Sequence, residues 1–189
     1  MNPNEMLNAE DQKFLFQLAR NTIRTTLQKG RRLPTVESLS PIMREKRGVF
    51  VTLWSADGLR GCIGLPFPIK PLVEAVQEAA NSAAFGDPRF PPLLQEEFSS
   101  IEIEISVLTV PKKIEPSKVK VGVHGLIVSK GHRSGLLLPQ VATEYRMDRE
   151  EFISQTCVKA GLPADAWREK VELSAFEAQV FAEVDLQKK

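Results

Sequence analysis

The chain has few cysteines and no long apolar run. These two absences argue against a disulfide-rich secreted protein and against a membrane-spanning protein. Cys62 and Cys157 are the only two cysteines among 189 residues, which excludes the dense disulfide framework of small secreted domains. The first 20 residues contain no apolar core suited to a signal peptide. No apolar run reaches the roughly 20 residues that span a bilayer. We therefore expect a cytoplasmic chain with reduced thiols and no membrane association.

An excess of charge of either sign is also missing. Lys and Arg total 25 and Asp and Glu total 24, which disfavours a nucleic-acid binder that works through a broad basic face. The run KKIEPSKVK, residues 112–120, is interpreted as a solvated loop and not as an RNA contact.

The signatures of common cofactor and metal sites do not occur. Neither G-x-x-x-x-G-K-[ST] nor G-x-G-x-x-G is present, so no phosphate-binding glycine loop is predicted. A metal site could be drawn from Cys62, His124 and Asp87, but these residues lack the close spacing of C-x-x-C or H-E-x-x-H. We predict no cofactor and no structural metal.

The length of the chain favours one domain over residues 1–189. A chain of this size buries roughly 70% of the surface that its unfolded form exposes, so its core needs neither a metal nor a disulfide. Apolar residues at helical spacing predict helices over residues 9–28, 70–84 and 149–160. Asn8 caps the first of these, which Gly30 ends, and a capping box of Asp148 and Glu151 begins the last.

Period-two patterns predict strands between the helices. Apolar and polar residues alternate over 101–108, and the odd-numbered valines from Val119 to Val123 repeat the pattern. Hairpins are predicted at Asp57-Gly58 and at Lys130 to Gly135, and residues 171–184 read as a strand or a bent strand pair. Helices and hairpins without regular βαβ alternation predict an α+β fold: a mainly antiparallel sheet with flanking helices.

The stretch DGLRGCIGLPF, residues 57–67, places an arginine and a thiol among glycines. If residues 59–64 are extended, Leu59, Gly61 and Ile63 point one way and Arg60 and Cys62 the other. A guanidinium so close favours the thiolate, the reactive form of cysteine. Glycines at 61 and 64 would let a ligand approach. The alternative is that these glycines serve a bulge and that Cys62 is a small buried apolar residue.

Five segments, in this order along the chain, together resemble the AMMECR family: LRGCIG (59–64), FGDPRFPPL (85–93), IEISVL (103–108), HGLIVSKGHRSGLLLPQVA (124–142) and CVKAGLPADAW (157–167). The resemblance covers about residues 10–183 and is strongest for the prokaryotic branch called AmmeMemoRadiSam system protein A. It implies a two-lobed α+β fold with the Arg-Gly-Cys-Ile-Gly element at a cleft. It further implies two partners, a MEMO-type protein and a radical-SAM protein, but no established reaction. Arg146-Met147 departs from the Gly-Trp that this branch favours.

The candidate site residues follow from the motif and the resemblance together. The candidates for catalysis are Cys62 as nucleophile or acid–base thiol, Arg60 as holder of an anionic group and His124 as base. The candidates for binding in the cleft are Gly61, Gly64, Asp87, Arg89 and Phe90, although Asp87-Pro88-Arg89 also fits a turn with a local ion pair. Cys157 is assigned to the core and His132 to solvent.

Three hypotheses for the function remain. The first is a non-enzymatic component of a MEMO/radical-SAM associated system that binds a partner or a small, anionic substrate around LRGCIG. The second is an enzyme that uses Cys62 on an unidentified substrate. The third, an RNA-binding accessory, is disfavoured by the near-neutral charge. We favour the first, because the Cys and His candidates have no assured third group to orient them.

Overall fold

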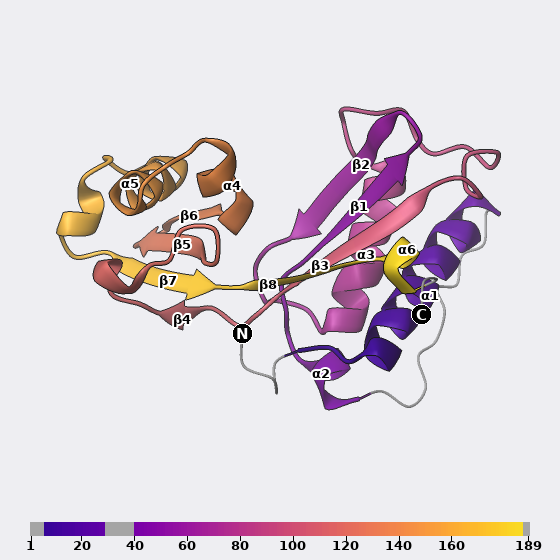
Figure 1. Ribbon diagram of the computed structural model, residues 1–189, viewed down its shortest axis with the longest axis horizontal. Helices are drawn as coiled ribbons and strands as arrows, with labels where there is room; N and C mark the ends of the chain where they lie inside the picture. Colours follow the sequence, from indigo (N-terminus) through magenta and orange to yellow (C-terminus); the bar gives the residue numbers. More distant parts are fainter. Residues whose placement is uncertain (1–5, 29–39, 187–189) are drawn as a thin grey trace. The chain divides into compact units, whose positions relative to one another are not determined.

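The computed structural model describes residues 6–28 and 40–186, and the chain folds into two compact units. The first unit combines Met1–Leu108 with Gln179–Lys189, and the second is Thr109–Ala178. Each unit has its own apolar core and its own four-stranded sheet. The predicted α+β class with antiparallel sheets is confirmed (Figure 1). The prediction of one domain over residues 1–189 stays a prediction.

The sheet of the first unit has the strand order β2-β1-β3-β8. Its strands are β1 (Val49–Ser55), β2 (Gly58–Leu65), β3 (Glu102–Leu108) and β8 (Ala178–Ala182). The predicted hairpin joins β1 to β2, and Gly58, with φ of 110°, pairs with Ser55 directly after the turn. Strand β2 is an edge of the sheet, so its outer backbone groups have no neighbouring strand.

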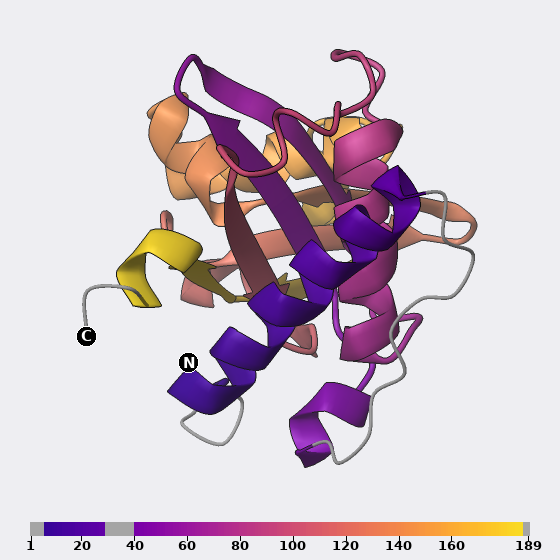
Figure 2. The ribbon, with the colours of Figure 1, turned by 90° about the vertical axis from the view of Figure 1, so that its right-hand side faces the viewer.

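Two long helices cover one face of this sheet (Figure 2). Helix α3 (Leu72–Phe85) packs on β1 and β2, and α1 (Ala9–Leu27) packs on α3. The side chain of Asn8 caps α1, accepting a hydrogen bond from the Asp11 N–H at 2.9 Å. Both helices confirm the predicted ranges to within two residues at each end, whereas Gly30 lies outside the described residues. Short helices α2 (Pro41–Arg44) and α6 (Glu183–Leu186) complete the unit.

The sheet of the second unit has the order β4-β7-β5-β6. The strands are β4 (Lys112–Lys113), β5 (Gly125–Lys130), β6 (Arg133–Leu137) and β7 (Glu172–Phe176). The helical segments are α4 (Pro139–Glu144), α5 (Arg149–Lys159), and the 3-10 turns η2 (Pro116–Lys118) and η3 (Ala166–Arg168). The hairpin predicted at Lys130 to Gly135 is confirmed, as is the cap of α5, where the Asp148 carboxylate accepts the Glu151 N–H at 2.8 Å.

One predicted strand is wrong. Val119 follows the η2 turn, and Val121 and Val123 lie in a hydrogen-bonded turn closed by the bond from the His124 N–H to the Lys120 carbonyl. Pro116 favours a turn over an extended run, and Val121 and Val123 are exposed. Val119 is buried in the core of the second unit, so the three valines share neither a sheet face nor one degree of burial.

Within the described ranges, no helix is long and apolar enough to cross a membrane.

Helices α4 and α5 end in the same way but with different residues. After α4, the N–H groups of Arg146 and Met147 bond to the carbonyls of Thr143 and Ala142; after α5, the corresponding bonds come from Gly161 and Leu162. This is the Schellman arrangement, whose key residue adopts positive φ and is usually glycine. Gly161 has φ of 71°, whereas Arg146 has φ of 53° and is the one non-glycine with positive φ in the described part of the chain. The departure noted at Arg146-Met147 thus falls on a strained backbone position.

We predict that Arg146→Gly stabilises the protein by about 0.5–1 kcal/mol, because the left-handed conformation costs an L-residue about 1–2 kcal/mol and the extra backbone entropy of glycine offsets part of the gain. The reciprocal change Gly161→Ala, in a site with no steric neighbour for a Cβ, should destabilise by about 1 kcal/mol. Urea denaturation of both variants measures this. Equal shifts in the same direction would contradict the assignment of strain to Arg146.

Candidate functional site

Cys62 lies on strand β2, on the sheet face opposite to the helices. It pairs with Thr52 of β1, and the Thr52 hydroxyl donates a hydrogen bond to its sulfur, with 3.3 Å between Oγ1 and Sγ. The thiol is half-buried. The Thr52 side chain therefore contacts the sulfur directly.

Two residues of the loop after α3 close the edge of the sheet at Cys62. The Cys62 N–H donates to the Asp87 carboxylate at 2.9 Å, and the Arg89 guanidinium donates to the Cys62 carbonyl at 3.3 Å. Arg89 also binds Asp87 through two guanidinium nitrogens, at 3.0 and 2.7 Å. The predicted local ion pair is present, and it replaces the missing strand neighbour of Cys62.

Asp87 is the most strongly perturbed acid of this cluster. Its side chain is 2% exposed. The hydrogen bond from Arg89 is the main cause that holds its pKa far below the ordinary range, and the Cys62 and Arg89 backbone N–H groups add to it. The pKa of Arg89 is raised, mainly by Asp87 and in smaller part by the charge of a Cys62 thiolate. Phe90 contributes a ring beneath the Arg89 guanidinium, 5.4 Å from it.

The glycines of the motif serve packing. A Cβ on Gly61 would lie 2.2 Å from the Ala83 carbonyl of α3, and one on Gly64 would lie 2.1 Å from the Phe50 ring. Both positions therefore allow close approach of another part of the first unit. The space that was predicted to admit a ligand at Gly61 and Gly64 is filled by the helix backbone and by the aromatic ring.

Arg60 has a different partner from the one expected. It occupies a bulge, since Trp54 pairs with Leu59 while Leu53 pairs with Gly61. The predicted strict alternation is wrong here, because the register puts Leu59 on the face of Cys62. The Arg60 guanidinium binds both carboxylate oxygens of Glu97, at 2.7 and 3.0 Å, and the Pro91 carbonyl at 3.0 Å. Glu97 raises the pKa of Arg60; the coupling of Arg60 to Cys62 stays a prediction.

A carboxyl extends the site across the sheet. Thr52 pairs with Glu104 of β3 on its other side, so Cys62, Thr52 and Glu104 form one row over three strands. Burial raises the pKa of Glu104, and a hydrogen bond from the Trp54 indole partly opposes the rise. The row thus combines a thiol, a hydroxyl and an acid that holds its proton to higher pH than usual. Such groups can bind a polar ligand or move a proton.

The remaining candidates lie in the second unit. His124 accepts the Lys120 N–H on Nδ1 at 3.2 Å, and burial lowers its pKa, so its ring is mainly neutral at pH 7. Cys157 is fully buried, as predicted, and burial raises its pKa. His132 is exposed, as predicted. No cluster of three or more His, Cys, Asp or Glu side chains suited to a metal is found among residues 6–28 and 40–186.

Comparison with known proteins identifies the family. The family described as AMMECR1 matches residues 16–181. The chain belongs to the AMMECR1 family. A protein of Methanothermobacter thermautotrophicus is 48% identical, with 94% of this chain and 96% of that protein covered. Protein MK0488 of Methanopyrus kandleri is 53% identical, with 95% and 91% covered.

A solved structure agrees with the fold. The crystal structure of the uncharacterised protein PH0010 from Pyrococcus horikoshii matches with a TM-score of 0.74 and 48% identity, over 90% of each chain. For this AMMECR1-family chain, the residues that sequence reasoning missed are Thr52, Glu104 and Glu97. The alternation predicted over residues 101–108 placed Glu104 on a polar face, but only the strand register aligns Glu104 and Thr52 with Cys62.

We predict that Asp87→Asn lowers the free energy of unfolding by about 1–3 kcal/mol at pH 7, because it weakens the buried bonds to Arg89 and to the Cys62 N–H. The folded pKa of Asp87 is depressed, so its contribution is complete above the unfolded pKa of about 4 and falls as the pH drops below it. Denaturation from pH 7 to pH 3 should show the two stabilities converging. Asp57→Asn, in the exposed hairpin turn, is the matched control; a pH-independent gap for Asp87→Asn would contradict the ionic role.

A second prediction concerns the reactivity of the thiol. Thr52→Val should slow the alkylation of Cys62 near neutral pH by about three- to tenfold, since the sulfur loses the hydrogen bond that the Thr52 hydroxyl donates to it, a bond worth about 1 kcal/mol. Arg89→Leu should act in the same direction and more strongly than Arg60→Leu, because the Arg89 guanidinium donates to the Cys62 carbonyl, whereas the Arg60 guanidinium binds Glu97 and the Pro91 carbonyl. Timed alkylation with peptide mapping gives the rates, and buried Cys157 is the internal reference. If Arg60→Leu has the larger effect, the pairing expected from the sequence is the correct one.

Proposed function

We propose that this chain is a component of a MEMO/radical-SAM associated system and that it binds a small polar ligand, or a partner residue, on the sheet face around Cys62. The observation that carries the proposal is the hydrogen bond from Thr52 to a half-exposed Cys62 whose backbone is fixed on its outer edge by Asp87 and Arg89. A thiol held in this way is pre-organised for recognition, because little conformational entropy remains to be lost on binding.

The ligand that fits this face carries negative charge or hydrogen-bond acceptors. The Arg89 side chain is 55% exposed beside the Cys62 carbonyl, and its fork can bind an anion while it keeps its bond to Asp87. The Glu104 carboxyl, with its raised pKa, can donate a proton to an acceptor when protonated. The family resemblance implies two partners, a MEMO-type protein and a radical-SAM protein. We propose that one of them produces or consumes this ligand.

A second candidate function is catalysis by Cys62. The juxtaposition of a hydrogen-bonded thiol with Glu104 across Thr52 favours it, since a nucleophile and a proton carrier then lie on one face. His124, the base expected from the sequence, belongs to the second unit, where burial lowers its pKa. Both cysteines are free, which accords with the cytoplasm, the compartment that we propose.

One experiment separates the two functions. The purified protein, alone and with its MEMO-type and radical-SAM partners, is incubated with a cell metabolite extract, and mass spectrometry records bound and transformed compounds. We expect a compound or partner that is retained by wild type and lost after alkylation of Cys62. Cys62→Ser should keep binding under the first function and abolish any transformation under the second.

The control variant is Ser134→Ala, an exposed position of the β5–β6 hairpin, which should bind as wild type does. Retention that is unchanged by alkylation of Cys62 would sink both functions at this face.

A further inference from the structure

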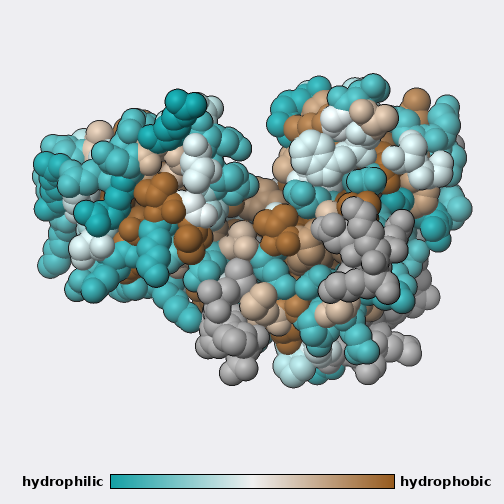
Figure 3. Space-filling view, in the orientation of Figure 1, coloured by the Kyte–Doolittle hydropathy of each residue, from teal (hydrophilic) through white to brown (hydrophobic). Residues whose placement is uncertain are grey.

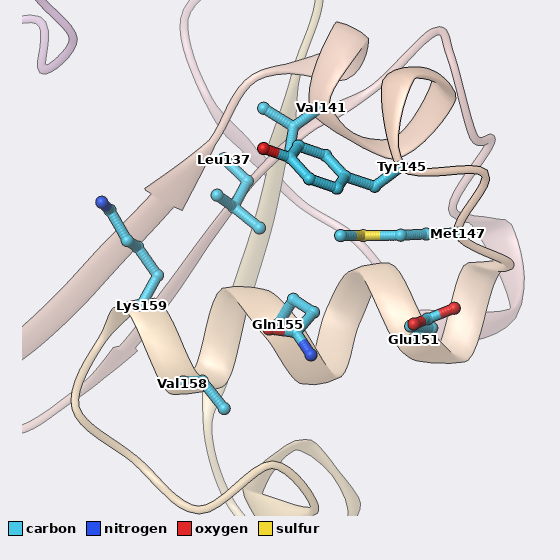
Figure 4. A pocket seen from close by; sticks show the side chains of 8 residues that line it. All are labelled: Leu137, Val141, Tyr145, Met147, Glu151, Gln155, Val158 and Lys159. Carbon is cyan, nitrogen blue, oxygen red and sulfur yellow. The ribbon is translucent and has the colours of Figure 1, made fainter.

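The second unit carries an open groove between α4 and α5, with a volume of about 650 Å³ (Figure 4). Every residue that lines the groove belongs to the second unit, Thr109–Ala178, whereas Cys62 belongs to the first. The lining residues are Leu137, Val141, Tyr145, Met147, Glu151, Gln155, Val158 and Lys159.

The groove exposes large apolar side chains that the core does not use. Tyr145, the one tyrosine of the chain, is 71% exposed, and Val158 is 51% exposed. Figure 3 shows apolar side chains gathered in patches on a mainly hydrophilic surface. Single exposed apolar residues are ordinary, but apolar residues that line one depression indicate an interaction site.

Opposite charges stand at the two ends of this groove. Glu151 lies in the first turn of α5 and Lys159 in its last turn, eight positions apart and therefore about 12 Å along the helix axis. Elsewhere in the unit, ion pairs join Lys130 to Glu169, Lys113 to Glu172 and Arg168 to Glu150. Within residues 6–28 and 40–186, neither Glu151 nor Lys159 has an ion-pair partner. The helix dipole favours both positions, and the result is a groove with a negative end and a positive end.

We propose that this groove binds an amphipathic helix of a partner protein, with two turns of apolar side chains between a basic and an acidic residue. An apolar stripe at i, i+3, i+4 and i+7 spans about 10 Å, which matches the distance between the charged ends. The basic residue pairs with Glu151 and the acidic residue with Lys159. An open groove suits a helix better than a small molecule, because small ligands are bound where most of their surface can be buried.

The test uses three designed helical peptides of about 18 residues, identical except for the two flanking positions: Lys and Glu, Lys and Lys, or Glu and Glu. Fluorescence anisotropy measures their binding to the full-length protein at concentrations up to about 1 mM. Wild type should prefer the Lys/Glu peptide by about fivefold. Glu151→Lys should shift the preference to Glu/Glu, and Lys159→Glu should shift it to Lys/Lys. Because preference is judged by charge pairing alone, the result does not depend on the direction in which the helix lies.

Two valines provide the apolar control. Val158→Ser in the groove should weaken all three peptides, whereas Val180→Ser, an equally exposed valine of the first unit, should change nothing. Binding without the shifts in charge preference, or no binding by any peptide, overturns the proposal. Sedimentation that reveals self-association abolished by Val158→Ser also overturns it, since a second copy of the chain would then be the occupant. None of these outcomes depends on Cys62.

Discussion

At the edge of the first sheet, two side chains take the place of a neighbouring strand and bond to the backbone of Cys62. The arrangement of the site depends on these two bonds. An edge strand leaves N–H and C=O groups without partners. The Asp87 carboxylate and the Arg89 guanidinium satisfy one of each at Cys62, while the Arg60–Glu97 pair fastens the far end of the same loop to β2. Because Asp87 is buried and bound to Arg89, the loop and the strand hold one another, and the thiol is fixed as a consequence.

The two faces of this sheet have separate roles. The face toward α3 is filled by Val49, Val51 and Leu53 of β1, all fully buried, and by the contact of Gly61 with the Ala83 carbonyl. Such tight packing leaves no freedom for chemistry. The opposite face carries the row of Cys62, Thr52 and Glu104, in which Thr52 is buried and the other two side chains are half-buried. Stability and the candidate function therefore occupy alternate residues of the same strands.

Much of the fold could be predicted because its signals are local. Helical periodicity and caps gave α1, α3 and α5, and the Asp57-Gly58 and Gly131 turns gave two hairpins. The valines at 119–123 misled because alternation alone does not record whether a face is buried. The site was less predictable for a related reason: the partners of Cys62 and Arg60 are 25 to 37 positions away or on another strand. A bulge was the alternative interpretation of the glycines in this segment, but its position at Arg60, where it interrupts the alternation, follows only from the strand register.

The residues of the Arg-Gly-Cys-Ile-Gly segment have different structural roles. Gly61 and Gly64 are accounted for by α3 and Phe50, Ile63 packs against the core of the first unit, and Arg60 anchors a loop. Packing therefore explains four of these positions without any ligand. It does not explain Cys62, because a half-exposed thiol on the polar face contributes little apolar burial, and serine would accept the same bond from Thr52. The sulfur is the one atom of the segment whose chemistry the fold does not require, and this is the reason to look for function there.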